Sequence, residues 1–422
     1  MPGVHNEHIA CSDFCPKSGG ARGRFRGIRL NPAGLGDTSN SEVICGTTPV
    51  LEMPGVHNEH IACSDFCPKS GGARGRFRGI RLNPAGFIGH SKWGALPYND
   101  FLRQAFPGQP KFTGENIPDL GDKVVVVTGA NTGVGKEIAQ LVYSRNARVY
   151  LMARSEKYTK KAIEDIKAAI PNSSGELVFI HLDLADLPSI KTSADDFLRR
   201  ERKLNVLFNN AGLGFPEKGS TTNQGYEIQL GVNCIGTFAL TKYLTSTLVS
   251  TAKSAPPNSV RVVWASSSAA EAITPKNYMD NVADIAKKAP HEAYFLSKLG
   301  NYFHSTEFAA RHKADGVVSV SLNPGNLDSD FWRTQGTITS WVLRKTLLNP
   351  PVYGAYTNIF AGFSPEVTLE KSGQFIAPWG RFWNISDDMV NASKSRALGG
   401  TGTAQDFWDW TESQVKLYQG KA

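Results

Sequence analysis

One stretch of the sequence constrains the fold more than any other: a β-branched run that leads into a glycine-rich turn. Lys123-Val-Val-Val-Val-Thr-Gly-Ala130 has the continuous apolar character of a strand that is buried on both faces. The turn Gly129-Ala-Asn-Thr-Gly-Val-Gly135 follows, and the next seven residues, Lys136-Glu-Ile-Ala-Gln-Leu-Val142, are helix-forming. Small residues here let the N–H groups of a helix N-terminus approach a phosphate. This order therefore predicts a dinucleotide-binding α/β domain.

Further strand signals follow along the chain, separated by helix-forming stretches. They are Arg148–Ala153, Leu177–Leu182, Asn205–Gly212 with its terminal Asn-Asn-Ala-Gly, Arg261–Ser268 with its three terminal serines, and Val317–Leu322. Strands that alternate with helices indicate a parallel sheet covered on both faces. We therefore predict a single Rossmann-type, doubly wound parallel sheet of about seven strands flanked by helices, over residues 91–422.

Residues 1–90 form a separate N-terminal extension, in which residues 1–34 recur without change as residues 53–86. Repeat folds keep a pattern and let other positions vary, so an exact copy favours a recent duplication or a gene-model artefact. The Gly, Asn, Ser and Arg content and the lack of periodicity predict disorder.

Two alternative functions of the extension stay open. His5, His8, Cys11 and Cys15, with their copies His57, His60, Cys63 and Cys67, are zinc-ligand types in an unusually tight spacing. The segment Gly19–Gly27 resembles an arginine-glycine RNA-binding segment. We predict neither a metal site nor a nucleic-acid partner.

The bulk composition limits the class of protein. With 41% hydrophobic and 20% charged residues and a net charge of +8 that is spread over the chain, it is typical of a globular protein. The sequence contains no apolar run of about 18 residues and no secretory-signal core, so we expect neither a transmembrane segment nor secretion. Only Cys234, an expected core residue, lies beyond the first 70 residues. This cysteine usage suits a reducing compartment, and we expect a cytoplasmic protein.

Tyr294 and Lys298 lie four residues apart in the helix-forming stretch His291–Tyr302. Residues i and i+4 project from one face of a helix, so their side chains lie together. A phenol with a pKa near 10 needs nearby positive charge to exchange a proton at neutral pH. The pair therefore indicates acid/base chemistry at the tyrosine hydroxyl.

Several motifs together resemble the short-chain dehydrogenase/reductase family across roughly residues 115–420: Thr-Gly-x-x-x-Gly-x-Gly, Asn-Asn-Ala-Gly, Asn-x-x-Gly and Tyr-x-x-Ser-Lys. The resemblance implies hydride transfer between a nicotinamide and a carbonyl or alcohol carbon. It assigns the catalytic roles to Asn233, Ser267, Tyr294 and Lys298. The serine would bond the substrate oxygen, and the asparagine would hold a water that links the lysine to solvent. Ser266 is the alternative serine, and Ser268 is expected to be a turn residue.

The same resemblance assigns the cofactor site. Its residues are Gly129, Asn131, Thr132, Gly133, Val134, Gly135, Arg154, Asp183, Leu184, Asn210, Ala211, Gly212, Tyr294, Lys298, Pro324, Gly325, Leu327 and Ser329. Arg154 stands at a strand end where NAD-preferring sites place a carboxylate, and a guanidinium can pair with a 2′-phosphate. We therefore predict a preference for NADP(H), with NAD(H) as the alternative.

Residues 328–350 correspond to the family's variable substrate lid, and their apolar content favours a small apolar carbonyl or alcohol substrate, such as a retinoid, sterol, polyketide-derived aromatic or lipid aldehyde. Packing on the core or on a dimer partner is the alternative explanation, and homodimer and monomer both stay open. The chain is most similar to retinol-dehydrogenase-like and WW-domain-oxidoreductase-like members, including fungal ones linked to secondary metabolism. A non-catalytic NADP(H)-sensing regulator on the same fold is the rival function.

Overall fold

The computed structural model describes residues 24–30, 36–42, 98–328 and 348–418. The chain divides into two units, Met1–Ile80 and Arg81–Ala422. In the first unit, β1 (Arg24–Leu30) and β2 (Gly36–Glu42) pair as an antiparallel hairpin. A hairpin of two strands alone is only marginally stable in water. The disorder of the extension and its boundary at residue 90 both stay predictions. The zinc-ligand candidates and the second copy of the duplication lie outside the described residues.

An eight-stranded sheet organises the second unit, in the order β10-β9-β8-β7-β6-β3-β4-β5. The bounds are β3 Val124–Thr128, β4 Arg148–Ala153, β5 Glu176–His181, β6 Val206–Asn209, β7 Arg261–Ala265, β8 Val318–Leu322, β9 Phe375–Ala377 and β10 Arg381–Trp383. All pairs are parallel except β9 with β10. The chain leaves the middle of the sheet in both directions, which is the doubly wound order. The predicted fold class is confirmed.

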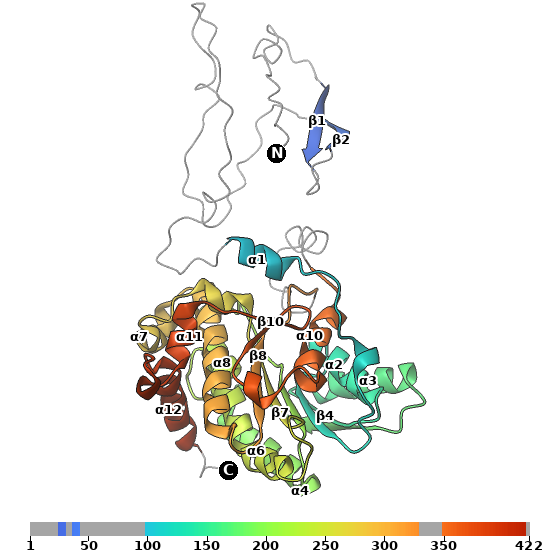
Figure 1. Cartoon of the computed structure of the whole chain (residues 1–422), viewed down its shortest axis with the longest axis vertical. Coiled ribbons are helices and arrows are strands. Elements are labelled where there is room, and N and C mark those ends of the chain that lie inside the picture. Colours follow the sequence, from blue (N-terminus) through green and yellow to red (C-terminus); the bar gives the residue numbers. More distant parts are fainter. Residues whose placement is uncertain (1–23, 31–35, 43–97, 329–347, 419–422) are drawn as a thin grey trace, which may run out of the picture. The chain divides into compact units, whose positions relative to one another are not determined.

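Helices cover both faces of the sheet (Figure 1). One face carries α2 (Gly133–Tyr143), α3 (Glu156–Ala169) and α10 (Pro351–Phe363). The other carries α4 (Leu187–Arg200), α6 (Thr237–Ala252) and α8 (Pro290–His312), with α7 (Tyr278–Ala283), α11 (Asp387–Ser393) and α12 (Thr403–Lys416) packed outside α8. α1 (Tyr98–Ala105) precedes the sheet in the chain, and α5 (Ile228–Leu230) runs into a π-helical turn, η5 (Gly231–Gly236). Within the described ranges no helix has both the length and the apolarity to cross a membrane.

The central strand shows why this sequence forms a sheet with two cores. Val124 and Val126 pack into the cluster beneath α6 and α8, whereas Val125 and Val127 pack into the cluster beneath α2 and α10. Successive strand side chains point to opposite faces, so a strand between two helical layers must be apolar at every position. All five residues of β3 are buried.

The junction of α8 with its outer helices is packed without spare room. A Cβ atom on Gly300 would lie 2.7 Å from Tyr278 Oη, 2.8 Å from Cys234 Sγ and 2.9 Å from Phe407 Cε1. Overpacking of this kind typically costs 1–3 kcal/mol, so we expect Gly300→Ala to lower the free energy of unfolding by about 2 kcal/mol in denaturant titrations. Gly108→Ala is the control, because a Cβ there has no atom within 4 Å. Equal stability of both variants would show that the junction yields without cost.

Candidate active site

The parallel register brings the carboxyl ends of the central strands to one edge of the sheet. The pairs nearest that edge are Thr128 with Met152, Val127 with Phe208, Asn209 with Trp264, and Ala265 with Leu322. The glycine turn, Arg154, Asn210–Gly212, Ser267 and the Pro324-Gly325 turn each follow a strand end, whereas Asn233, Tyr294 and Lys298 lie on helical segments. Residues far apart in the sequence therefore lie along one crevice, at the place where ligands bind in open α/β sheets.

The glycine-rich turn after β3 is shaped by backbone constraints. Gly129 and Gly133 have φ of 68° and 53°, which favour glycine. A Cβ on Gly135 would lie 2.4 Å from Gly129 O and 2.7 Å from Asn210 Nδ2, so this position has no room for a side chain. α2 begins at Gly133, and its first N–H groups have no partner within the helix. The turn thus presents a helix N-terminus at the crevice, as predicted.

The Thr128 side chain fixes this turn to the end of β6. Its hydroxyl donates to Phe208 O at 3.2 Å and accepts from the N–H groups of Asn210 at 3.0 Å and Ala211 at 2.9 Å. Asn210 Nδ2 donates back to Thr128 O at 2.9 Å. The Asn210 side chain therefore ties the Asn-Asn-Ala-Gly strand end to the start of the glycine turn.

The ends of β4 and β5 continue the crevice beyond the glycine turn. Arg154 directly follows β4 and is exposed, and Asp183 follows β5 after one residue. The Asp183 carboxylate accepts from Ala185 N at 2.9 Å, and Leu184 is buried. These residues lie at the same edge as the glycine turn, where the resemblance places the adenosine half of the cofactor.

Tyr294 and Lys298 lie on α8, as predicted, and both side chains are buried. Lys298 Nζ lies 5.6 Å from the centre of the Tyr294 ring and donates to Ala265 O at 2.9 Å. The centre of the Phe215 ring lies 5.1 Å from the centre of the Tyr294 ring. Phe215 has a left-handed backbone, φ 52°, and donates its N–H to Gln229 Oε1 at 3.1 Å.

The two adjacent serines after β7 have different surroundings. Ser266 is buried and donates to Lys298 O at 2.7 Å, so its hydroxyl is committed to the backbone of α8. Ser267 accepts from Ala269 N at 3.1 Å, and its side chain is hydrogen-bonded to Tyr294. The structure therefore brings Ser267, and not the alternative Ser266, to the tyrosine. Ser268 begins a short 3-10 helix, η6 (Ser268–Ala272).

Asn233 lies in the π-helical turn η5 and is fully buried. Its Nδ2 donates to Leu213 O and to Ser297 Oγ, each at 3.0 Å, and its Oδ1 accepts from Leu213 N at 2.9 Å. A Cβ on Gly212 would lie 3.2 Å from Asn233 Oδ1 and 3.5 Å from Lys298 Nζ. Asn233 and Lys298 thus approach the loop after β6 from two sides, and Gly212 leaves space between them.

Burial determines the protonation of the central pair. It raises the pKa of Tyr294 above its usual value near 10, an effect that the hydrogen bond with Ser267 opposes. It lowers the pKa of Lys298 to about 8. The free protein therefore holds a protonated phenol beside a lysine that titrates near neutrality.

The turn after β8 closes the crevice. Gly325 has φ 94°, and a Cβ there would lie 2.7 Å from Trp379 Cζ3. Its N–H donates to Asn323 Oδ1 at 3.0 Å. Pro324 lies between these two residues, and the buried Leu327 pairs with Asn349. Ser329 and lid residues 329–347 lie outside the described residues.

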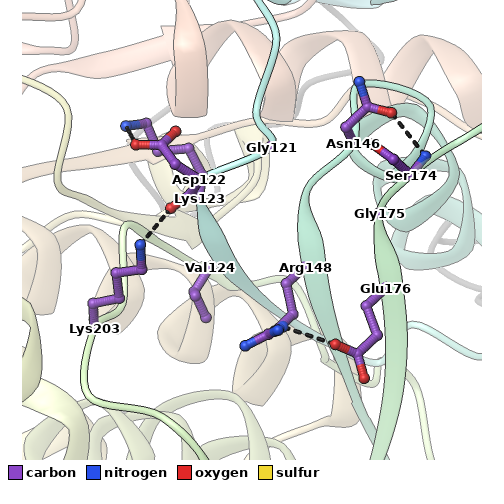
Figure 2. Close-up of a pocket in the computed structure, with 10 residues that line it drawn as sticks. All are labelled: Gly121, Asp122, Lys123, Val124, Asn146, Arg148, Ser174, Gly175, Glu176 and Lys203. Atoms are coloured by element: carbon purple, nitrogen blue, oxygen red, sulfur yellow. Dashed lines mark hydrogen bonds and ion pairs between the residues drawn. The ribbon is translucent and has the colours of Figure 1, made fainter.

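A separate polar hollow opens at the opposite edge of the sheet, at the amino ends of β3, β4 and β5 (Figure 2). Its charged groups are already engaged with neighbours. Arg148 pairs with Glu176 at 2.8 Å, and Lys203 Nζ donates to Asp122 O at 2.8 Å. This hollow is not part of the crevice.

Comparison with known proteins settles the family. Residues 123–278 match the short chain dehydrogenase family. A short-chain dehydrogenase/reductase of Phomopsis amygdali is 51% identical over 320 residues, covering 75% of this chain and 96% of that protein. Another, from Neocamarosporium betae, is 42% identical over 346 residues, covering 80% and 100%. This chain belongs to the short-chain dehydrogenase/reductase family. A solved structure from Mycobacterium paratuberculosis, 25% identical, shares its fold with a TM-score of 0.52 over 72% of this chain and 97% of that one.

Membership confirms the predicted family and the prediction that the chain is an oxidoreductase that uses a nicotinamide cofactor. Both relatives are fungal, in agreement with the fungal resemblance. Sequence reasoning missed Phe215, whose contact with Tyr294 depends on a loop conformation that no local pattern signals.

The burial of Lys298 lowers the stability of this short-chain dehydrogenase/reductase at neutral pH. The lysine pKa is 10.5 when unfolded and about 8 when folded. Protonation at pH 7 therefore costs the folded state about 3 kcal/mol. Lys298→Met removes that cost, and Ala265 O keeps a hydrogen bond from Asn301 Nδ2 at 3.1 Å. We expect the melting temperature of the nucleotide-free variant to rise by a few degrees at pH 7.

The pH dependence provides the control for this prediction. The cost is full below pH 8 and disappears as the pH rises through 10.5, where both states are neutral. The advantage of Lys298→Met should therefore shrink between pH 8 and 10.5. A variant that melts below the wild type at pH 7 would show that the bond to Ala265 O outweighs the burial of charge.

Proposed function

We propose that this enzyme interconverts a carbonyl and an alcohol on an apolar substrate, with NADP(H) as its preferred cofactor and Tyr294 as the acid/base. The observation that carries the proposal is the convergence of Tyr294, Ser267, Lys298 and Asn233 on the crevice that begins at the glycine turn. These four residues come from three separate segments of the chain, 233, 267 and 294–298. Acid/base groups beside a phosphate-binding turn are what nicotinamide-dependent carbonyl chemistry requires.

The glycine turn fits a dinucleotide. A Cβ on Gly129 would lie 3.0 Å from Ala211 Cα and one on Gly135 would lie 2.4 Å from Gly129 O, so glycines let the turn fold tightly against the start of α2. The N–H groups at the start of α2, together with the partial positive charge of the helix end, favour a pyrophosphate there. When bound, the nicotinamide supplies or accepts the hydride, and the protein supplies the proton.

Tyr294 is protonated at neutral pH in the free enzyme, which is the state needed to donate a proton to a carbonyl oxygen. Ser267 uses an acceptor lone pair for Ala269 N, so its hydroxyl hydrogen can bond the phenol or a substrate oxygen. The Lys298 ammonium stabilises the phenolate after proton transfer. Asn233 joins this region to the loop after β6 through both of its bonds to Leu213.

The preference for NADP(H) rests on Arg154. It stands at the end of β4, where a carboxylate would bind the ribose hydroxyls of NAD. An exposed guanidinium at this place can make a charged, two-pronged bond to a 2′-phosphate. The neighbouring Lys157 adds a second positive charge on the first turn of α3.

The apolar substrate class rests on aromatic surroundings of the reacting hydroxyl. Phe215 packs against the Tyr294 ring, and Phe295 lies 6.3 Å from it by ring centres. Lid residues 329–347 include the apolar residues Phe331, Trp332, Trp341, Val342, Leu343 and Leu347. The fungal relatives, with the resemblance described above, support a role in fungal secondary metabolism.

Tyr294→Phe tests the acid/base assignment. General acid/base groups contribute typically 10²–10⁴-fold, so we expect turnover of NADPH with apolar ketones and aldehydes to fall by about that factor. The dissociation constant for NADPH should change by less than about twofold, because the ring and its packing remain. Tyr302→Phe is the control on the same helix, since its hydroxyl bonds Ser393 Oγ at 3.4 Å, on the side of α11. Full turnover in Tyr294→Phe would show that Tyr294 is not the acid/base, whereas NADPH binding by the wild type without turnover of any substrate in either direction would favour the non-catalytic sensor.

Arg154→Ala tests the cofactor preference. Loss of a charged bond to the 2′-phosphate should raise KM for NADPH at least about tenfold, and KM for NADH should stay within about twofold. Arg148→Ala is the matched control, because Arg148 starts the same strand at the opposite edge. If Arg154→Ala raises both KM values equally, Arg154 does not discriminate between the cofactors.

A further inference from the structure

Gln104 on α1 connects two loops of the active site through one buried amide. Its side chain is 2% exposed. Its Nε2 donates to Glu271 Oε2 at 2.8 Å, and its Oε1 accepts from Asn323 Nδ2 at 3.0 Å. Glu271 lies in η6, four residues after Ser267. Asn323 begins the Pro-Gly turn after β8.

The donor and acceptor of each hydrogen bond in this series are fixed by the groups at the two ends of the series, the Gly325 N–H and the Glu271 carboxyl. The N–H of Gly325 can only donate, so the atom of Asn323 that it meets at 3.0 Å must be the oxygen. The amide nitrogen of Asn323 then points to Gln104 Oε1, which leaves Gln104 Nε2 for the Glu271 carboxyl. Only a side chain with one acceptor and one donor at this reach satisfies both neighbours.

The helix that carries Gln104 is held on the sheet edge by neighbouring contacts. The Arg103 guanidinium lies 5.3 Å from the ring centre of Trp383 on β10, and Arg381 Nη2 donates to Arg103 O at 3.0 Å. Among the described residues the buried Trp383 indole nitrogen has no hydrogen-bond partner, and its N–H favours the charged form of the Glu271 carboxyl. Burial raises the pKa of Glu271 to about 7. The hydrogen bond from Gln104 therefore stabilises a carboxyl group that is buried away from solvent.

We infer that Gln104 is a positioning residue that sets the spacing between the Ser267 segment and the Asn323–Gly325 turn, so that α1 is part of the active site. The inference rests on the proposed function, in which Ser267 bonds the substrate oxygen and Pro324 and Gly325 belong to the cofactor site. The hydrogen-bonded path Gly325–Asn323–Gln104–Glu271 joins the two segments through side chains, independently of the sheet. A helix upstream of the residues matched to the family, 123–278, thereby governs both binding events.

Gln104→Leu in the full chain tests this role. The apolar side chain breaks both bonds, and we expect the dissociation constant for NADPH, measured by titration calorimetry, to rise about tenfold. Turnover with an accepted ketone should fall by a similar factor. Glu271→Gln keeps a carbonyl acceptor for Gln104 Nε2, so its dissociation constant should stay within about twofold of the wild type. This conservative variant separates the effect of the hydrogen bond between Gln104 and residue 271 from the effect of the negative charge of Glu271.

Gln414→Leu is the matched control, because Gln414 is also a helical glutamine with a side-chain bond, to Tyr226 Oη at 3.1 Å, on α12. It should leave NADPH binding unchanged. If Gln104→Leu binds NADPH as the wild type does and turns over at the wild-type rate, the inference is wrong while the proposed function stands. If the wild type itself binds neither NADPH nor NADH, the proposed function fails, and the inference fails with it.

Discussion

The parallel pairing of β3 with β4 on one side and β6 on the other is the constraint on which the rest of the structure depends. Because the register places the ends of these strands level, the glycine turn, Arg154 and the Asn-Asn-Ala-Gly segment meet at one edge. The Thr128 hydroxyl then joins two of these ends by three hydrogen bonds. A slip of the register would separate the segments and turn every valine of β3 to the wrong core.

α8 shows how the fold holds charged and polar groups away from water. The helix buries Lys298, Asn301, His304 and Ser305 among apolar neighbours, and most of these groups reach a backbone or side-chain partner. Burying an ammonium is costly unless it is hydrogen-bonded. Lys298 Nζ meets this need with one carbonyl, and its lowered pKa shows the cost that remains. Functional sites are where such costs are retained.

Much of the fold could be predicted because its signals are local. The apolar run of β3, the glycines of the turn and the helical spacing of Tyr294 and Lys298 each report on a few adjacent residues. β9 and β10 could not be predicted, since three residues give too little alternation to detect. The resemblance assigned Ser267, but local evidence could not exclude Ser266, because the distinction depends on which hydroxyl faces the backbone of α8.

The sequence by itself determined the family, the position of the first strand of the parallel sheet and the residue types of the site. These features rest on strand burial, glycine conformations and the i, i+4 pair, which are properties of short segments. The tertiary structure decided which distant groups touch. Phe215 beside Tyr294, and Gln104 between Glu271 and Asn323, depend on packing across more than 70 residues of chain. The physical reason is that a hydrogen bond or ring contact is set by distance in space, and sequence spacing carries no record of that distance outside regular elements.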